Sequence, residues 1–270
     1  HTIVGGYDYY KDAMNKYQDQ YTPNMTGTVD NKAFFIEDKM KFGAFTVTPG
    51  VRLSKHSEYG NKTTASGVIS YDFNDITTMY VSYKEFFRAP YLYELYNPFY
   101  GSGKLNPEEG ETKEIGFNTR IDNKTTFAAH YYQTDSDNLI GFNSDTWKYY
   151  NAGAERIKGW DVQLTKLFDK NLSVTLAYTH TYIAPTNSDS NANRNGYIPK
   201  GQYDLSLNYE NSKFNGIVTV KGIVDRTGNK KYENDVADSF KNIWTMDAAL
   251  NYKPVKGMNI FLKANNIFDS

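Results

Sequence analysis

Apolar and polar residues alternate one by one along most of this chain, and this alternation limits the folds open to it. It is clearest in segments 45–52, 114–121, 172–179, 203–210 and 244–251. A period of two places apolar side chains on one face of a β-strand and polar side chains on the other. About thirteen such strands fit into the chain, most of roughly 10 residues or more, which matches a tilted transmembrane strand.

The connections between these segments separate a membrane barrel from a soluble sandwich. Tight polar turns alternate with longer connections along the chain, as in an up-and-down barrel with short periplasmic turns and long extracellular loops. The expected tight turns are Phe42–Gly43, Asn74–Asp75, Asp122–Asn123, Asp169–Lys170, Asn211–Ser212 and Lys253–Gly257. The expected long connections are Asp12–Asn31, Lys55–Lys62, Phe87–Gly110, Ile183–Lys200 and Thr227–Ser239, with Asn143–Thr146 as one short member.

Aromatic residues support the same interpretation. The chain has 24 Tyr, 16 Phe and 3 Trp, which make 16% of its residues. Rings beside the tight turns fit an aromatic girdle at the level of the lipid headgroups. The rings in question are Phe42, Phe45, Phe73, Phe168, Tyr209, Phe214 and Tyr252. We therefore expect an all-β, antiparallel, up-and-down transmembrane β-barrel.

An odd strand number indicates that this barrel is incomplete, because bacterial single-chain barrels close with an even number. The chain begins within a predicted strand and ends at Asp269–Ser270 without a terminal strand. We expect residues 1–270 to be the C-terminal portion of a 22-stranded barrel, whose lumen is plugged. The N-terminal plug and the first strands then lie outside this chain.

Composition excludes several functions. The net charge of −1 and the absence of basic runs give no indication of nucleic-acid binding, and the absence of cysteine excludes thiolate metal sites and cysteine nucleophiles. Gly101–Lys104 lacks the pattern of a phosphate-binding loop, and Asp135–Asn138 lacks the Gly and Glu positions of a calcium loop. No catalytic constellation emerges, so we expect no enzyme, no metal site and no cofactor.

Short motifs in a fixed order resemble those of the TonB-dependent outer-membrane receptors. Phe87-Arg88-Ala89-Pro90 resembles the FRAP box of that family, and Leu105-Asn106-Pro107-Glu108 is similar to its NPxLxPE box in a different order. Tyr150-Asn151-Ala152-Gly153 through Ile157-Lys158-Gly159 matches the YxNxGxxxIKG element. Further similar pieces are Thr48–Arg52, His56–Gly60, Glu114–Phe117, Asp137–Ile140 and Asn265–Asp269.

The resemblance implies a function that composition does not give. Members of the family are ligand-gated importers in the bacterial outer membrane, with a barrel and an N-terminal plug, and they are energised through TonB. The resemblance also implies three partners: the TonB-ExbB-ExbD complex, a metal chelate and the lipid of the outer membrane. The absent plug would contact the TonB-ExbB-ExbD complex. A ferric siderophore is the first expectation, and cobalamin or haem is the alternative within the family. The alternative from another class is a passive porin-like or adhesin-like barrel.

Ligand recognition is expected from aromatic residues in two of the long connections. A dense set of rings suits stacking on a flat ligand, although any single ring has the competing role of girdle or loop packing. The candidates are Tyr91, Tyr93, Tyr96, Phe99 and Tyr100 in the first connection, and Trp147 and Tyr149 in the second.

Histidines and strand charges complete the prediction. No histidine lies between Arg88 and Asn106, which weakens axial haem ligation from that loop without excluding a tyrosine ligand. His56, His130 and His180 are expected to be structural, with His130 pointing into the lumen. Charged residues at the polar positions of the alternation are expected to face the lumen, because Arg or Lys on the lipid face costs about 2–4 kcal/mol. These residues are Arg52, Lys84, Arg88, Arg120, Asp161, Asp204 and Asp247.

Overall fold

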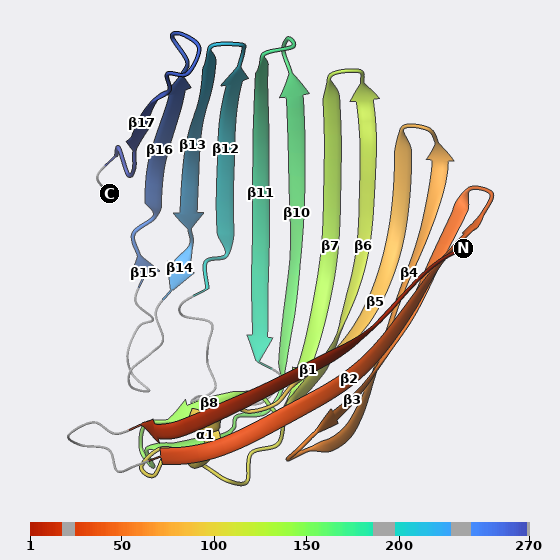
Figure 1. The fold of residues 1–270 in the computed structure, drawn as a ribbon, viewed down its shortest axis with the longest axis vertical. Helices are drawn as coiled ribbons and strands as arrows, with labels where there is room; N and C mark the ends of the chain where they lie inside the picture. The colour runs from red at the N-terminus through yellow and green to blue at the C-terminus, as the bar shows by residue number, and fades with distance from the viewer. Residues whose placement is uncertain (18–24, 186–197, 228–238, 269–270) are drawn as a thin grey trace.

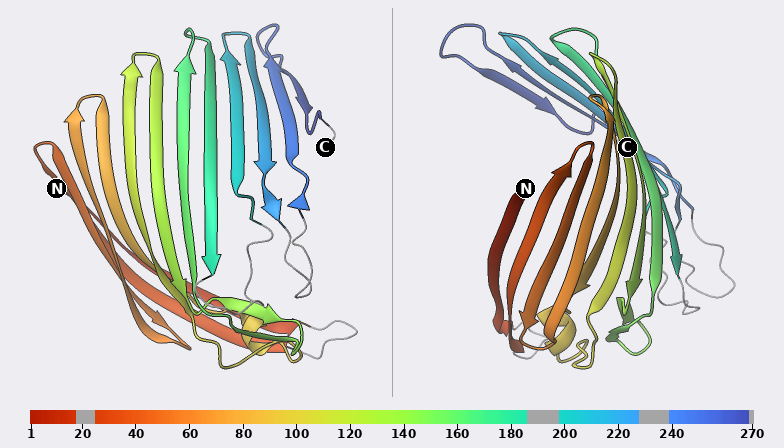
Figure 2. Two further views of the ribbon diagram at one scale, coloured as in Figure 1. Left: turned by 180° about the vertical axis from the view of Figure 1, so that it is seen from behind. Right: turned by 90° about the vertical axis from the view of Figure 1, so that its right-hand side faces the viewer.

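Thirteen strands form one antiparallel sheet in chain order. The computed structural model describes residues 1–17, 25–185, 198–227 and 239–268. The sheet is strongly curved, with β1 (Thr2–Tyr17) at one edge and β17 (Ile260–Ala264) at the other (Figure 1). Seen from the side, it bends around a concave face (Figure 2). The expected all-β, up-and-down architecture and strand number are confirmed.

The remaining elements follow the sequence order. The other strands of the sheet are β2 (Met25–Phe42), β3 (Phe45–His56), β4 (Gly60–Asn74), β5 (Thr77–Arg88), β6 (Glu108–Asp122), β7 (Thr125–Asp137), β10 (Glu155–Leu167), β11 (Leu172–Pro185), β12 (Gly201–Glu210), β13 (Phe214–Val224) and β16 (Ile243–Tyr252). Outside the sheet lie α1 (Leu92–Tyr96) and two small hairpins, β8 (Ile140–Asn143) with β9 (Lys148–Asn151), and β14 (Arg226–Thr227) with β15 (Ser239–Phe240). No helix in the described ranges is long and apolar enough to cross a membrane.

Tight turns gather at one end of the strands and long connections at the other, as Figure 1 shows. The six expected tight turns are all found at the first end. At the other end, three expectations need correction. The ladder between β3 and β4 continues to the pair His56 and Gly60, so the connection expected at Lys55–Lys62 is a turn of residues 57–59. Similarly, β1 and β2 extend well into the connection expected at Asp12–Asn31.

The connection expected at Asn143–Thr146 does not join two strands of the sheet. It forms the tip of the β8–β9 hairpin, which lies inside a longer connection from residue 138 to 154. The reason is that Asn143 caps the tip locally: its side-chain oxygen accepts the backbone N–H groups of Asp145 and Thr146 at 2.8 and 3.1 Å. The other parts of the long connections, 18–24, 186–197 and 228–238, lie outside the described residues.

The register assigns every strand residue to one of two faces. Opposed residues in neighbouring strands share a face, so Lys84 shares a face with Thr112, which is paired with Thr134. His130 and Asp161 oppose each other on this face, and their side chains lie 3.3 Å apart. The seven charged residues that were expected to face the lumen all lie on this concave face: Arg52, Lys84, Arg88, Arg120, Asp161, Asp204 and Asp247.

The opposite face carries an exposed apolar band between two rows of rings. Leu176 in the band is 50% exposed, as a lipid-facing residue is. Towards the tight turns, the ring centroids of Tyr71 and Phe45 lie 4.6 Å apart, and the stacked rings of Phe214 and Tyr252 have centroids 4.4 Å apart. Towards the long connections a second row runs through Trp160, Tyr178, Tyr203 and Trp244, with centroids 5.1, 4.5 and 5.8 Å apart. The first girdle is the one expected from the sequence.

Two arginine substitutions one residue apart test these faces. Leu176→Arg places a charge on the apolar face and should lower the free energy of unfolding by about 2–4 kcal/mol. Ala177→Arg places the same charge on the concave face opposite Asp204, and should change it by less than about 1 kcal/mol. Urea unfolding of the full-length protein in lipid vesicles measures both. Equal losses would contradict the assignment.

Candidate functional site

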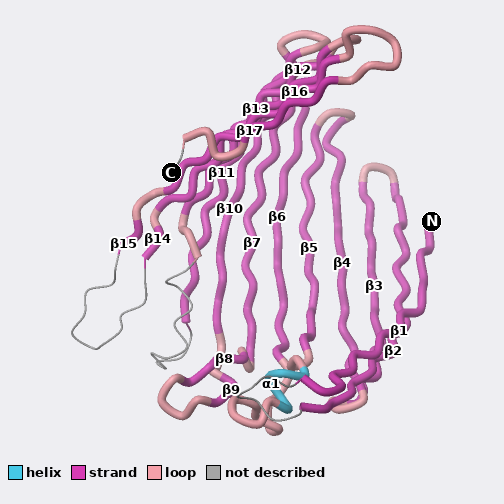
Figure 3. The backbone as a smooth tube through the Cα atoms, turned by 60° about the vertical axis from the view of Figure 1, so that its left-hand side comes forward, coloured by secondary structure: helices cyan, strands magenta, loops and turns pink. Residues whose placement is uncertain are grey.

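Two long connections pack together as a layer over one end of the sheet. Residues 89–107 carry α1 and residues 138–154 carry the β8–β9 hairpin, and both lie beyond the same ends of the strands (Figure 3). Leu95, Leu105 and Ile140 form a buried apolar cluster against which Tyr149 packs. The backbone N–H of Tyr149 donates to the carbonyl of Tyr100 at 2.9 Å. Apolar burial and backbone pairing thus join the two loops into one unit.

Asn151 is the main polar link between these loops. Its side-chain oxygen accepts the N–H of Asn106 at 2.8 Å, and its amide nitrogen donates to the carbonyls of Asn106 at 3.0 Å and Asn138 at 2.7 Å. An amide offers both donors and an acceptor, which few side chains can replace. Two motif pieces that resembled the family therefore meet here through hydrogen bonds.

Arg88 of the FRAP-like box is held by carboxylates of the protein. Its guanidinium donates two hydrogen bonds of 2.7 Å to Glu108 and lies 3.4 Å from Glu94. The hydrogen bonds to Glu108 raise the pKa of Arg88 above its usual range. Glu108 also accepts the N–H of Ile140 at 2.7 Å, and Glu94 accepts the N–H of Tyr91 at 2.8 Å. Arg88 therefore fixes the starts of both loops.

The IKG motif has a packing role on β10. A side chain at Gly159 would place its Cβ 2.4 Å from ring atoms of Tyr132, so only glycine lets that ring lie flat on the neighbouring strand. The Tyr132 hydroxyl lies 3.3 Å from the Thr181 hydroxyl, one strand further on. Ile157 and Lys158 belong to the same strand and lie on opposite faces. None of these residues reaches the loop layer through a described contact.

Most of the candidate ligand-binding aromatics form one connected set of rings. Tyr100 lies 6.1 Å from Phe99, 5.8 Å from Phe142 and 6.0 Å from Trp147. Phe142 contacts Tyr149 at 5.2 Å, and Tyr149 meets Tyr93 edge-on at 6.2 Å. Phe142, which the sequence analysis did not single out, joins the rings of the two loops.

Exposure divides these candidates into two groups. Tyr91, Phe99 and Trp147 are 63%, 48% and 60% exposed and offer their surfaces to a ligand. Tyr93, Tyr100 and Tyr149 are half-buried. Tyr96 is exposed on one side and packs with the other on Gly27 of β2, where an added Cβ would lie 2.6 Å from its ring. Trp147 also has a positive φ of 55°, a conformation that L-residues adopt only at an energetic cost.

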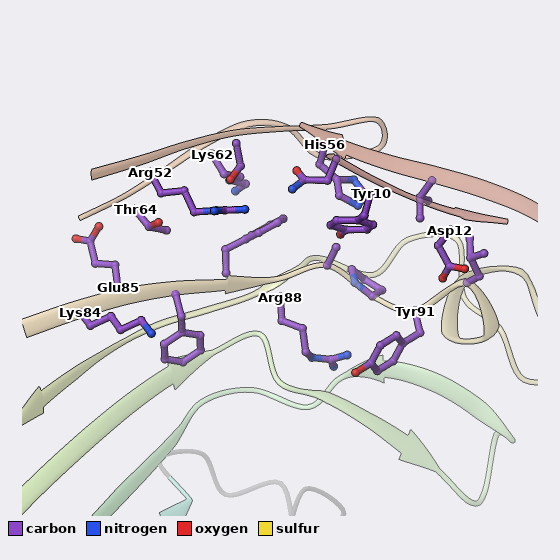
Figure 4. Close-up of a pocket in the computed structure, with 18 residues that line it drawn as sticks. Tyr10, Asp12, Arg52, His56, Lys62, Thr64, Lys84, Glu85, Arg88 and Tyr91 are labelled. Carbon is purple, nitrogen blue, oxygen red and sulfur yellow. The ribbon is translucent and has the colours of Figure 1, made fainter. Parts of the chain in front are cut away.

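Beneath this layer, the concave face has a pocket of about 520 Å³ (Figure 4). Arg52 on β3 and Lys84 and Arg88 on β5 are among the residues that line it (Figure 4). The Arg52 guanidinium is 2.6 Å from the Asp8 carboxylate, whereas no ion pair to the Lys84 amine is found within the described residues. Phe86, Phe87 and Tyr91 add aromatic walls. The lining also carries the carboxylates of Asp12 and Glu85, and Arg52, Lys62 and Arg88 are all paired with carboxylates. The positive charge that remains beside the rings is therefore that of Lys84.

His56 and Asn31 contribute buried polar atoms to the pocket. They oppose each other on β3 and β2 and are 2% and 6% exposed. The N–H of Glu58 donates to Nδ1 of His56 at 3.2 Å, which leaves the proton of a neutral ring on Nε2. Burial lowers the pKa of His56, because the imidazolium is the poorly solvated form. Neither Nε2 of His56 nor Oδ1 of Asn31 has a hydrogen-bond partner in the part of the chain described.

His56 lies at the end of its strand, His130 on the concave wall, and His180 beside Trp160, with ring centroids 5.9 Å apart. The position expected for His130, on the lumenal side of the sheet, is confirmed. No group of three or more His, Cys, Asp or Glu side chains in the described ranges is placed to hold a metal ion. The pocket residues Tyr10, Asn31 and His56 were not identified as a set from the sequence, because three separate strands contribute them.

Comparison with known proteins fixes the family. Residues 1–267 match the family model described as the TonB-dependent receptor-like β-barrel. The chain belongs to this family. Its fold is therefore that of an outer-membrane barrel, here as an unclosed sheet, and the family consists of receptors and transporters, not enzymes.

Similar proteins bind or transport different ligands. The chain is 30% identical over 160 residues to the vitamin B12 transporter BtuB of two Vibrio cholerae strains, which covers 58% of this chain and 25% of theirs. The ferric enterobactin receptor PfeA of Pseudomonas aeruginosa, solved with enterobactin, aligns with a TM-score of 0.79 at 15% identity, over 99% of this chain and 46% of that receptor. The FrpB iron transporter of Neisseria meningitidis aligns with a TM-score of 0.75 at 16% identity, over 99% and 48%. The chain thus spans just under half of these solved receptors.

Substitution of Asn151 tests the link between the loops. Asn151→Ala removes three hydrogen bonds, which should speed amide exchange in residues 97–107 roughly ten- to hundredfold. Hydrogen exchange followed by mass spectrometry measures this in the full-length receptor. Asn143→Ala is the matched control, since it alters only the tip of the same hairpin. Unchanged exchange in 97–107 would show that apolar packing alone joins the loops.

Proposed function

We propose that this chain forms a recognition wall of a TonB-dependent importer of a ferric siderophore in the bacterial outer membrane. The remaining strands, up to a 22-stranded barrel, and a plug that contacts the TonB-ExbB-ExbD complex are supplied by residues outside these 270. Family membership supports the importer, and the pocket supports the siderophore. Outer-membrane lipid surrounds the apolar band.

The single observation that carries the substrate class is the character of the pocket wall. Lys84 on β5 and Arg52 on β3 both line it, and aromatic rings lie beside them. A ferric catecholate is anionic and aromatic, so it gains from both features. The exposed rings of Tyr91, Phe99 and Trp147 provide a first contact surface on the outside.

Cobalamin is the second candidate, because the chain is 30% identical over 160 residues to two vitamin B12 transporters. Charge distinguishes the two ligands. Cyanocobalamin has no net charge, so its binding would depend little on Lys84. Haem is a weaker candidate: no histidine lies between Arg88 and Asn106, and His56 is almost fully buried.

Titration of the purified full-length receptor with ferric enterobactin, cyanocobalamin and haemin tests the proposal. Ferric enterobactin should bind, and Lys84→Gln should lower its affinity about tenfold, because a charge-assisted contact is lost. Lys170→Gln, in a tight turn at the other end of the sheet, should leave the affinity unchanged. Binding of cyanocobalamin alone would replace the first candidate with the second. Binding of haemin alone would favour a haem receptor.

Uptake by whole cells tests the class of transporter. Import should stop in cells that lack TonB or a membrane potential, because the proposed importer depends on energy from the inner membrane. A passive porin-like barrel, the alternative from another class, would import the same ligand at an unchanged rate. An adhesin-like barrel would import none.

A further inference from the structure

The ladder between β4 and β5 ends before either strand does. Its last pair is Ser66 and Lys84, yet β4 continues to Gly60 and β5 to Arg88. Over these stretches β4 still pairs with β3 up to Gly60, and β5 still pairs with β6 up to Glu108. No other pair of neighbouring strands in the described sheet both continue in this way beyond their last pair. We call the interval between residues 60–65 and 85–88 the seam.

Side chains hold the seam where backbone pairing is absent. One carboxylate oxygen of Glu85 accepts the N–H of Ala65 at 2.8 Å, and the other accepts the Tyr83 hydroxyl at 2.9 Å. Lys62 crosses the seam to form an ion pair with Glu109, and its ammonium lies 5.6 Å from the centre of the Phe87 ring. Surface ion pairs and single side-chain hydrogen bonds are weaker than a continuous ladder. The sheet therefore separates here at lower cost than at its other strand pairs.

The lumenal pocket lies across this seam. Of its 18 lining residues, nine belong to β1–β4 and nine form the continuous stretch 84–92 on β5 and the following loop. A second, outer groove of about 320 Å³ lies at the same seam and shares five of these residues. The width of the pocket is thus set by how closely residues 60–65 approach residues 85–88.

The loop layer provides a second tie between the same two parts. α1, which follows β5, contacts β1 and β2, and the Tyr59 hydroxyl donates to the carbonyl of Leu105 at 3.1 Å. Burial raises the pKa of Tyr59 to about 12, so this donor stays protonated at neutral pH. Below Ser66 and Lys84 the ladder continues to the pair of Asn74 and Thr77, with one irregularity between Asp72 and Asn74. The seam thus has a backbone ladder at its lower end and only side-chain and loop contacts at its upper end.

The two sides of the pocket carry complementary parts of one ligand site. Arg52, His56 and Asn31 belong to the β1–β4 side, and Lys84 with the Phe86 and Phe87 rings belongs to the other. Nε2 of His56 and Oδ1 of Asn31 are buried without a described partner, as groups awaiting a polar ligand would be. A ligand that touches both sides draws them together.

From these observations we infer that the seam is a hinged jaw, which closes the pocket on an anionic, aromatic chelate. The inference rests on the proposed function, since it takes the importer's ligand as the closing agent. Glu85 is the latch: it substitutes for a missing backbone acceptor on β5 while lining both the pocket and the outer groove. Binding energy gained across the seam shifts the wall towards the closed form.

Distance measurement across the seam tests the jaw. The chain has no cysteine, so spin labels can be attached to Asn61→Cys on β4 and Asp137→Cys on β7, both exposed and on opposite sides. Ferric enterobactin added to the labelled full-length receptor should give a shorter and narrower distance distribution. Labels at Asn171→Cys and Asn211→Cys, in two tight turns at the other end, should show no change. Bound ligand with an unchanged distribution across the seam would overturn the jaw and leave the proposed function intact.

Substitution of the latch gives an independent readout. Glu85→Leu should speed amide exchange at Ala65 by about tenfold and lower the affinity for ferric enterobactin to a similar degree. Glu85→Gln keeps an acceptor, so both quantities should stay close to those of the wild type. Glu210→Leu, at the tight-turn end of β12, is the matched control. Faster exchange with unchanged affinity would also overturn the jaw. Failure of ferric enterobactin to bind the wild-type receptor overturns the proposed siderophore and the ligand-driven jaw, and exchange at Ala65 then reports seam opening alone.

Discussion

The structure depends on backbone pairing between neighbouring strands. Inside a bilayer no water is available to unpaired N–H and C=O groups, so each strand must be paired along its membrane-embedded length. The ladders run in sequence from β1 to β17, and this continuity decides which side chains face lipid and which face the concave side. Because each strand tilts and pairs with the next, charged residues as distant in sequence as Arg52 and Asp247 lie on one wall. The membrane thus requires continuous strand pairing, and this pairing decides which side chains come together on the concave face.

How much the sequence predicts follows from the same constraint. Within the membrane the two faces of a strand meet different surroundings, so period-two alternation assigns side chains correctly, as Asp161 opposite His130 illustrates. Beyond the girdle both faces are wet and the alternation weakens. For that reason the ends of β3 and β4 at His56 and Gly60 and the hairpin around Asn143 were not predicted. The second girdle was detectable, since Trp244 lies on the same face as Tyr252 at the other end of β16.

The candidate site divides along similar lines. The sequence identified the aromatic residues of two loops as a set, and the structure joins most of them through ring contacts. Their role towards a ligand stays a prediction. The pocket beneath could not be predicted, because Tyr10, Asn31 and His56 come together only through pairing of β1, β2 and β3 and the curvature of the sheet. The link from Asn151 to Asn106 joins residues 45 positions apart, and no local pattern reveals it.

The motif residues and the pocket residues have different tasks. Arg88 has its charge satisfied by Glu108 and Glu94, so little of its attraction remains for a ligand. Lys84, four residues earlier on the same strand and on the same face, has no ion-pair partner within the described residues. Two cations on one strand thus differ in function because of what surrounds them: Arg88 fixes the loops, and Lys84 stays available. A resemblance carried by the motifs accordingly indicates the scaffold, whereas the substrate class that we propose rests on residues such as Lys84 that lie outside them.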